Sequence, residues 1–415
     1  MDAGFFCNVK RSKLHDDNKQ RGAKINKRYR IGLKIVLILF LFSHCGPKQQ
    51  KVERHMEEGV EIIVNHLEPY KIEGEPTTIR LEELFVIDTE KDELVDAGLT
   101  TINNFDVDSE NNLYILSSRT EKNFIFKFDC NGELTLTFGR KGEGPGELHR
   151  PRSLLIGARD EIAVAVGITN KLSIFNTEGK LLQEKKYNSS IGNVMGAYSL
   201  EDGQYLLAMH EYPTKENSFC SQYYFSLCDI KLEEIKEIDR IQIPFPEFHD
   251  KFEGMYHTYF GCVSDGKIFT AFQDRGYEIR VYDLGGNLLR KIRKKYKPVP
   301  VSDEFKKRYL MAFMRPRDAE TRKKIYFPDS MPPFHSFFTD DEGRVFVMTY
   351  EQGENLSEYI YDIFNKDGIY IERKAMNILH DRNGLYAWIK KDRLYCLQEK
   401  HSFFKRLVVF KVCWE

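Results

Sequence analysis

The chain has 415 residues, of which 41% are hydrophobic and 13% aromatic, and this composition excludes a wholly disordered protein. Its 62 Lys and Arg against 63 Asp and Glu leave a net charge of −1, which excludes a strongly basic nucleic-acid-binding protein. The charge is unevenly distributed, because residues 1–34 hold ten basic and three acidic residues, a net +7, while the other 52 basic and 60 acidic residues carry −8. The two parts are therefore interpreted separately. The length alone predicts two or three domains unless the chain is built from repeats.

A short apolar segment follows the basic N-terminal region. Residues 35–42 read I-V-L-I-L-F-L-F, and Cys45 follows three positions later. A membrane-spanning helix needs about 20 apolar residues, whereas a shorter apolar core after positive charge is typical of a secretory signal peptide. A Cys directly after that core resembles the lipobox of bacterial lipoproteins, and the resemblance implies that Cys45 becomes a lipidated N-terminus. An uncleaved single-span anchor and a cytoplasmic protein are the alternatives.

These features predict three parts of the chain. Residues 1–44 are predicted to be a basic region with a lipoprotein signal peptide, residues 45–76 a lipidated Cys and a tether, and residues 77–415 the folded domain. The tether is predicted from the polar composition of residues 46–58. The predicted location is the cell envelope, as an outer-membrane lipoprotein that faces the periplasm or the surface.

From residue 105 onward, one short pattern recurs six times. Each copy is a turn with Gly, Asn or Asp, followed by a run of β-branched and aromatic residues, and the copies recur at intervals of about 43 to 77 residues. Because Gly, Asn and Asp tolerate the positive φ angles of tight turns, each copy predicts a β-hairpin. The copies span residues 111–116, 160–165, 202–208, 265–271, 342–348 and 391–397.

A second turn follows most copies of the first, so each unit predicts two hairpins, or four antiparallel strands. Six such units favour a six-bladed β-propeller, an all-β fold. The last unit lacks one strand, which residues 77–84 can supply, and this closure hides the open sheet edges. A five-bladed ring with a separate hairpin is the alternative. The second turns span residues 128–134, 175–182, 282–289 and 364–370, with a degenerate copy at 228–235.

One connection carries a known signature. Residues 138–151 read F-G-R-K-G-E-G-P-G-E-L-H-R-P, which resembles the NHL-repeat signature. Together with the lipobox and the six units, it makes the chain similar to the six-bladed β-propeller lipoproteins of Gram-negative gut bacteria. The resemblance implies the fold of residues 77–415 and little about activity. The glycines of this connection can cradle an anion through exposed amides, or they merely form the turn.

A helical insertion is predicted at about residues 296–338, between the fourth and fifth units. Ser302 or Asp303 can cap a helix there, and the following segment places Phe305 and Tyr309 on one helical face. Connections longer than about 15 residues are usually functional. We therefore expect this one to lie over the mouth of the central channel as a lid or partner surface, with a plain stabilising cap as the alternative.

The candidate binding residues follow from propeller topology. The connections between units share one face with the loops that join the two hairpins of a unit, and propellers usually bind ligands there. Arg275 can clamp a carboxylate or sulfate bidentately, or pair with Asp274 or a neighbouring blade, and His149 can be a ligand or base, or a solvated side chain. The candidates are Arg119, His149, Arg150, His210, Arg275, Tyr277, Arg315, Arg317 and Tyr326.

Enzyme signatures are absent from the sequence. There is no G-x-S-x-G elbow, H-E-x-x-H motif, P-loop or Rossmann fingerprint, so no catalytic residue, metal ligand or cofactor is predicted. The six cysteines after Cys45 form no C-x-x-C pair and are predicted to be free, with a Cys220–Cys228 bridge across a hairpin as the alternative.

The predicted function is a binding or scaffold module for a glycan, a peptide or a protein partner. It is expected to be a monomeric propeller, held to the membrane by its N-terminal lipid, that binds no nucleic acid. One alternative is a metal-dependent hydrolase or lyase of the propeller lactonase type, which would hold Ca or Zn among converging carboxylates and His with perturbed pKa values. Another is a sensor or assembly subunit of an envelope complex. A binding module predicts an open face with exposed aromatic and Arg side chains.

Overall fold

The computed structural model describes residues 52–415 except 118–119, 121, 158, 167–170, 187–192, 201–202, 246–248, 256–258, 312–318, 356, 379, 382–383, 386 and 400–404. The signal peptide, Cys45 and the first part of the tether lie outside the described residues. Residues from Val52 to Glu415 form one compact unit.

Six sheets follow one another along this unit, each with a core of four antiparallel strands, as the two turns per repeat predict. The innermost strands, β4, β8, β12, β17, β22 and β28, line a common channel. We call the sheets blades 1 to 6. Blades 1 to 3 consist of β4 (Asn104–Val107), β5 (Leu113–Leu116), β6 (Asn123–Phe128) and β7 (Leu134–Arg140); β8 (Pro151–Ile156), β9 (Ile162–Val166), β10 (Lys171–Phe175) and β11 (Leu181–Lys186); and β12 (Asn193–Ser199), β13 (Tyr205–Glu211), β14 (Cys220–Cys228) and β15 (Glu234–Pro244).

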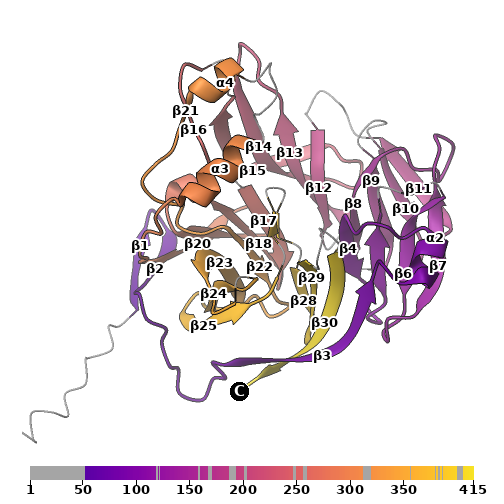
Figure 1. Cartoon of the computed structure of the whole chain (residues 1–415), viewed down its shortest axis with the longest axis horizontal. Helices are drawn as coiled ribbons and strands as arrows, with labels where there is room; N and C mark the ends of the chain where they lie inside the picture. The colour runs from indigo at the N-terminus through magenta and orange to yellow at the C-terminus, as the bar shows by residue number, and fades with distance from the viewer. Residues whose placement is uncertain are drawn as a thin grey trace, which may run out of the picture. The chain divides into compact units, whose positions relative to one another are not determined.

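The last three blades complete the ring, and the predicted six-bladed architecture is confirmed. Blade 6 takes its fourth strand from the N-terminal side, because β3 pairs antiparallel with the C-terminal β30, and Figure 1 shows the two strands side by side. The strands are β17 (Tyr259–Ser264), β18 (Lys267–Phe272), β19 (Glu278–Asp283) and β20 (Leu288–Lys294); β22 (Ser336–Thr339), β23 (Val345–Gln352), β24 (Tyr359–Phe364) and β25 (Tyr370–Met376); and β28 (Ala387–Lys390), β29 (Arg393–Glu399), β30 (Lys405–Trp414) and β3 (Ile79–Asp88).

The repeated turns share one hydrogen-bond scheme. In blade 1, the Asp129 carboxylate accepts the amides of Asn131 and Glu133, both at 2.9 Å, and Gly132 adopts φ +90° and donates to the Asp129 carbonyl at 3.0 Å. The degenerate turn of blade 3 keeps the scheme, although Leu232 occupies the left-handed position with φ +66°. The same aspartate or asparagine position is occupied by Asp129, Asn176, Asp229, Asp283 and Asn365.

The start of the described chain corrects the predicted tether. β1 (Glu53–Glu57) and β2 (Val60–Asn65) form a hairpin, and β2 pairs parallel with β20, which makes blade 4 six-stranded. Ile62 and Ile63 are fully buried, and the Asn65 side chain bonds the backbone of Gly368 and Tyr370 in blade 5. The polar composition missed this hairpin because β1 is a charged, exposed edge strand.

The predicted insertion between blades 4 and 5 contains two short helices, α3 (Asp303–Met311) and α4 (Ala319–Lys323). Ser302 caps α3, since its hydroxyl accepts the Phe305 amide at 3.1 Å. The insertion is tied to the connection between blades 3 and 4, because β21 (Ile325–Tyr326) pairs with β16 (Phe252–Glu253). The remaining elements are α2 (Asp92–Ala97), the 3₁₀ turn η4 (Gln273–Arg275), β26 (His380–Asp381) and β27 (Gly384–Leu385).

The predicted alternative of a Cys220–Cys228 bridge is wrong. Both cysteines lie at opposite ends of the single strand β14, and eight residue steps of about 3.3 Å separate them far beyond disulfide reach. Both are free thiols.

Candidate functional site

The two faces of the ring are built differently. We call the bottom face the one that carries the turns between strands one and two and between strands three and four of each blade. The top face carries the connections between blades and the loops between strands two and three. The bottom turns bond to one another across blades: the Asp160 carboxylate accepts the Ser109 amide at 2.8 Å, and the Asp341 carboxylate accepts the Lys391 amide at 2.6 Å. These two pairs of neighbouring bottom turns are therefore held together by their own hydrogen bonds.

A central channel of about 960 Å³ runs between the inner strands of all six blades. The backbone amides and carbonyls on one edge of each inner strand face the channel. Side chains of neighbouring blades form hydrogen bonds with some of these groups. In blade 2, the Leu154 amide donates to Asn104 Oδ1 at 2.8 Å, and the Ile156 amide donates to Asp106 Oδ2 at 2.7 Å. Asp106 also accepts Lys390 Nζ from blade 6. These polar side chains are engaged in closing the ring.

The same device recurs elsewhere around the channel. Trp388 Nε1 of blade 6 donates to the Phe105 carbonyl of blade 1 at 3.1 Å, and the Tyr198 hydroxyl of blade 3 donates to the Gly261 carbonyl of blade 4 at 2.5 Å. Buried backbone groups without a hydrogen-bond partner are costly, so these hydrogen bonds stabilise the ring. The polar side chains that form them are not available to bind a ligand.

The channel mouth between blades 2 and 3 is different. Arg152, at the start of β8, is exposed and lines the channel, and its Nη1 lies 3.6 Å from Met195 Sδ. On the side of blade 3 that faces blade 4, the His210 ring stacks on Tyr223 with ring centroids 4.5 Å apart and meets the edge of Tyr212 at 4.9 Å. Burial, and after it the nearby Arg152 charge, lowers the pKa of His210 below its ordinary 6.5. The imidazole is therefore neutral at neutral pH.

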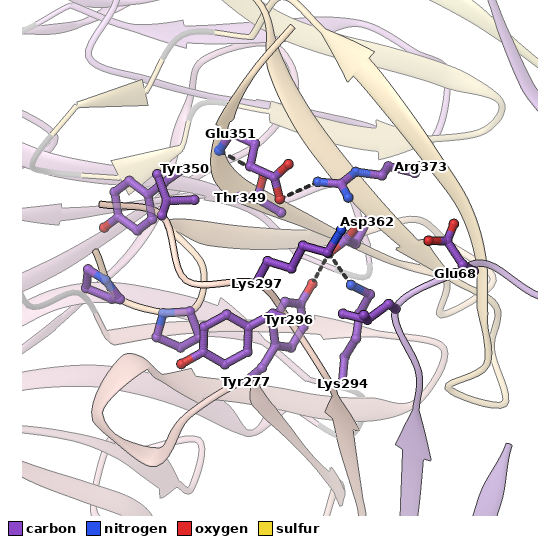
Figure 2. A pocket seen from close by; sticks show the side chains of 14 residues that line it. Glu68, Tyr277, Lys294, Tyr296, Lys297, Thr349, Tyr350, Glu351, Asp362 and Arg373 are labelled. Carbon is purple, nitrogen blue, oxygen red and sulfur yellow. Dashed lines mark hydrogen bonds and ion pairs between the residues drawn. The ribbon is translucent and has the colours of Figure 1, made fainter. Parts of the chain in front are cut away.

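A small polar pocket of about 30 Å³ lies between blades 4 and 5, with walls from the N-terminal segment and the insertion (Figure 2). Lys294 Nζ lies 3.2 Å from the Asp362 carboxylate, and both side chains are at least 97% buried. The hydroxyls of Tyr277 and Tyr370 donate to the same carboxylate at 2.8 and 3.0 Å. A cavity of this volume holds about one water molecule.

The charged side chains of this pocket pair with one another. Burial, followed by the Asp362 charge, raises the pKa of Tyr277 and of Tyr370, so both hydroxyls stay protonated and donate. Arg373 points towards Glu351 in Figure 2, with 2.5 Å between Nη2 and Oε1. The pocket therefore joins the two blades to the insertion as a structural seam, and it has little room for a ligand.

The glycine-rich connection between blades 1 and 2 closes around a carboxylate of its own. Glu147 Oε2 accepts the Gly144 amide at 3.0 Å, and Glu147 Oε1 accepts Arg140 Nε at 3.1 Å. A Cβ on Gly142 would lie 1.9 Å from Glu147 Oε2, so the glycine is needed for this packing. The predicted anion cradle is thus filled by the loop itself. His149 is also engaged, since its Nδ1 lies 2.9 Å from Glu143 Oε1.

Arg275 is engaged by a neighbouring blade rather than free for a ligand. Its two terminal nitrogens bond the Asp239 carboxylate of blade 3 at 2.6 Å each, and this carboxylate also accepts the Thr270 hydroxyl at 2.9 Å. The bidentate clamp that the sequence predicted therefore exists, but its carboxylate is internal. Tyr277 is likewise buried in the seam.

The other predicted residues are scattered over the top face. Arg150 is exposed on the connection between blades 1 and 2, and Tyr326 is 49% exposed on β21. The insertion packs through Val301 and Met331 against Met255 of the connection between blades 3 and 4. Among its described residues, Phe337 and Phe338 of β22 line the channel. Residues 312–318 lie outside the described residues, so a lid over the channel mouth stays a prediction. Arg119, Arg315 and Arg317 lie outside the described residues.

No three His, Cys, Asp or Glu side chains of the described part of the chain come together as a metal-binding group. Likewise, none of its helices is both long and apolar enough to cross a membrane.

Comparison with known proteins agrees with this architecture. The family model DUF5128, described as a 6-bladed beta-propeller, matches residues 87–293, which span blades 1 to 4. The fold is a six-bladed β-propeller. No curated protein sequence matches the chain significantly.

Solved structures resemble the chain at low sequence identity. A Bacteroides fragilis protein described as exported is 14% identical, with a TM-score of 0.52 over 85% of this chain and 99% of its own. A DUF4221 family member from Bacteroides vulgatus is 16% identical, with a TM-score of 0.49 over 82% and 100% of the two chains. Virginiamycin B lyase from Staphylococcus aureus is 10% identical, with a TM-score of 0.42 over 80% and 99%. At these identities the likeness concerns the fold alone.

Sequence reasoning missed the two groups that distinguish the top face. Arg152 lies directly after Pro151, the last residue of the segment that resembles the NHL-repeat signature, and only the structure reveals that Arg152 lines the channel. Asp362 lies in a β-strand pattern, and its partner Lys294 is 68 residues earlier in the chain. A charged residue inside an otherwise apolar strand was the available signal for Asp362.

Proposed function

We propose that the protein is an exported, envelope-anchored β-propeller that binds a glycan or peptide ligand, or a protein partner, on its top face. The observation that carries the proposal is the contrast between the faces. The bottom turns bond one another, whereas the top face surrounds the channel mouth with long connections and exposed aromatic side chains. Among these, Tyr212 is 61%, Tyr296 39% and Tyr326 49% exposed. Tyrosine offers a rigid apolar surface with a polar tip, which suits ligand recognition.

Export and anchoring rest on the N-terminal sequence. The basic region, the short apolar segment and Cys45 match a lipoprotein signal, and the B. fragilis structure of the same fold is described as exported. The folded unit begins at Val52, so a lipid on Cys45 would hold the propeller within about 25 Å of the bilayer, given about 3.5 Å per extended residue.

Ligand binding is tested by screening the purified protein on a glycan array and a peptide library. Tyr212→Ala should weaken the strongest interaction at least about tenfold, since 1.4 kcal/mol of lost contact corresponds to that factor. The matched control is Ile230→Ala, because Ile230 is 56% exposed on a bottom turn. Equal binding by the two variants would move the site away from the top face.

Anchoring is tested separately with Cys45→Ser. The variant cannot be lipidated at this position, so it should keep its signal peptide, which an increase in apparent mass reports. A variant that stays in the membrane fraction at unchanged mass would contradict lipidation at Cys45.

A further inference from the structure

The described chain begins at the top rim of blade 4. β2 runs parallel to β20, so the hairpin of β1 and β2 lies at the outer edge of this blade (Figure 1). Because β20 runs from a bottom turn to the top face and β1 is antiparallel to β2, the first residues of β1 lie at the top end. Glu53 Oε1 accordingly lies 3.0 Å from His66 Nε2 and 3.9 Å from Lys295 Nζ. The tether that follows Cys45 therefore joins the propeller at the top face.

The insertion between blades 4 and 5 starts at the same place. Lys295 follows β20 directly, and its amide donates to the Asn65 carbonyl at 2.9 Å. Both ends of the insertion also line the small pocket of Figure 2 together with the N-terminal segment. Residues 46–51 are all that separate Cys45 from Val52, so a lipid on Cys45 would keep Val52 within about 25 Å of the bilayer. The insertion therefore lies within reach of the same bilayer.

The insertion carries a charge opposite to that of the rest of the propeller. Residues 295–335, which connect β20 to β22, hold ten basic and five acidic residues, a net +5, and the described residues among them carry +4. The other residues from 52 to 415 hold 40 basic and 55 acidic residues, a net −15. A basic segment next to a membrane anchor is attracted by anionic lipid headgroups. The exposed basic side chains of the insertion include Lys295, Lys297, Lys307, Arg308 and Lys323.

Exposed apolar side chains accompany these charges. In α3, Phe305 and Tyr309 pack inwards against the rest of the insertion, and helical spacing then places Lys307 and Met311 on the opposite side. Met311 is 63% exposed, and Tyr326 of β21 is 49% exposed. Tyrosine is enriched at the boundary between lipid and water, because its ring is apolar and its tip polar. An acidic protein would match the charge alone, whereas a membrane also matches these side chains and the neighbouring anchor.

We infer that the insertion between blades 4 and 5 is a second membrane contact of the anchored propeller. Its exposed lysines and arginine bind anionic phospholipid headgroups, while Met311 and Tyr326 meet the boundary between headgroups and acyl chains. The tether favours this contact because it keeps the insertion at a high effective concentration near the bilayer. The top face at blades 4 and 5 then points towards the membrane. The inference rests on the proposed anchoring and names the surface that the propeller presents to the bilayer.

Vesicle sedimentation with the unlipidated chain tests the inference. Residues 46–415 contain the whole compact unit, whose ring is closed by its own strands, and they lack the signal peptide and Cys45. This protein should bind phosphatidylcholine vesicles that contain about 30% phosphatidylglycerol at least about tenfold more strongly than vesicles of phosphatidylcholine alone. Raising NaCl to about 0.5 M should remove the difference, because salt screens the attraction between exposed charges.

Two triple variants locate the contact on the molecule. Lys297→Gln, Lys307→Gln and Lys323→Gln together should weaken binding to the anionic vesicles at least about tenfold. The control removes the same charge from three bottom turns and should change binding less than about twofold, because that face points away from the bilayer. All six lysines are exposed, so both variants should keep the wild-type melting temperature. The control combines Lys180→Gln, Lys231→Gln and Lys366→Gln.

The outcomes separate the inference from the proposed function. If both triple variants lose vesicle binding equally, binding follows net charge alone and the inference is wrong. If the protein binds soluble poly-glutamate through the three lysines of the insertion and ignores the vesicles, an acidic protein partner is indicated and the inference is also wrong. If no vesicle binds while Cys45→Ser gives the expected increase in mass, the second contact is wrong and the anchoring stands. If the vesicles bind through the insertion while Cys45→Ser leaves the mass unchanged, the membrane contact stands and lipidation at Cys45 is wrong.

Discussion

On the bottom face, one aspartate or asparagine scheme recurs in seven of the described turns, and each uses hydrogen bonds between residues two to four positions apart. On the top face, the contacts described above join distant parts of the chain. Arg275 bonds Asp239, and Lys294 pairs with Asp362. The repeated face thus encodes the scaffold locally, whereas the irregular face depends on long-range pairs.

The largest loss of folding stability is expected when a buried long-range ion pair is broken. Asp362→Asn removes the carboxylate that compensates the Lys294 charge in the seam between blades 4 and 5. Breaking a buried ion pair by removing one partner costs about 3–5 kcal/mol. Urea unfolding followed by tryptophan fluorescence should show a lower midpoint and a free energy of unfolding reduced by about this amount.

An exposed aspartate provides the control for the seam. Asp250→Asn makes the same chemical change on an exposed residue, and surface substitutions usually stay within about 0.5 kcal/mol. If both variants unfolded at the same urea concentration, the seam would not hold the top face together, and the contrast between the faces would lose its main support.

The second effect concerns two glycines. Gly142→Ala on the top face should cost about 2–3 kcal/mol, because the new Cβ would lie 1.9 Å from Glu147 Oε2 and must displace that carboxylate. Gly266→Ala on a bottom turn meets no atom within 4 Å and pays only for its left-handed backbone, φ +63°, or about 1 kcal/mol. Thermal melts of the two variants give the order, and an equal loss would show that the loop tolerates a displaced Glu147.

The same contrast explains what the sequence could predict. The bottom turns were recognisable from single motifs such as F-D-C-N-G-E-L, because each hydrogen-bond scheme closes within about five residues. The pairing of β3 with β30 followed from a missing strand. The hairpin at residues 53–65 was not recognisable, because its edge strand is charged and its partner lies about 230 residues later. Arg275 was identified as a bidentate clamp, but the sequence could not say that Asp239 would fill it.

A smaller effect tests whether the bottom turns are interchangeable. Asn occupies the turn position of Asp129 in blades 2 and 5, at Asn176 and Asn365, so Asp129→Asn should be nearly neutral. Asp129→Ala leaves two amides without their acceptor and should cost about 1 kcal/mol, since this turn is partly exposed to water. Chemical unfolding of both variants measures the difference. A loss for Asn as large as that for Ala would show that the turn depends on charge rather than on geometry.

The smallest effect is a change in the acid dependence of stability. The Gly144 amide, and after it Arg140, lowers the pKa of Glu147 below its ordinary 4.5. A carboxyl whose pKa is lower in the folded state stabilises the fold above its unfolded pKa, and this contribution is lost as the pH falls towards the folded value. Wild-type stability should therefore decline as the pH drops below about 4.5, and Glu147→Gln, which cannot titrate, should decline less over the same interval. Melting temperatures at pH 7, 5, 4 and 3 give the two curves. Parallel curves would mean that Glu147 is as accessible to protons in the folded loop as in the unfolded chain, and that the loop does not hold it as an internal anion.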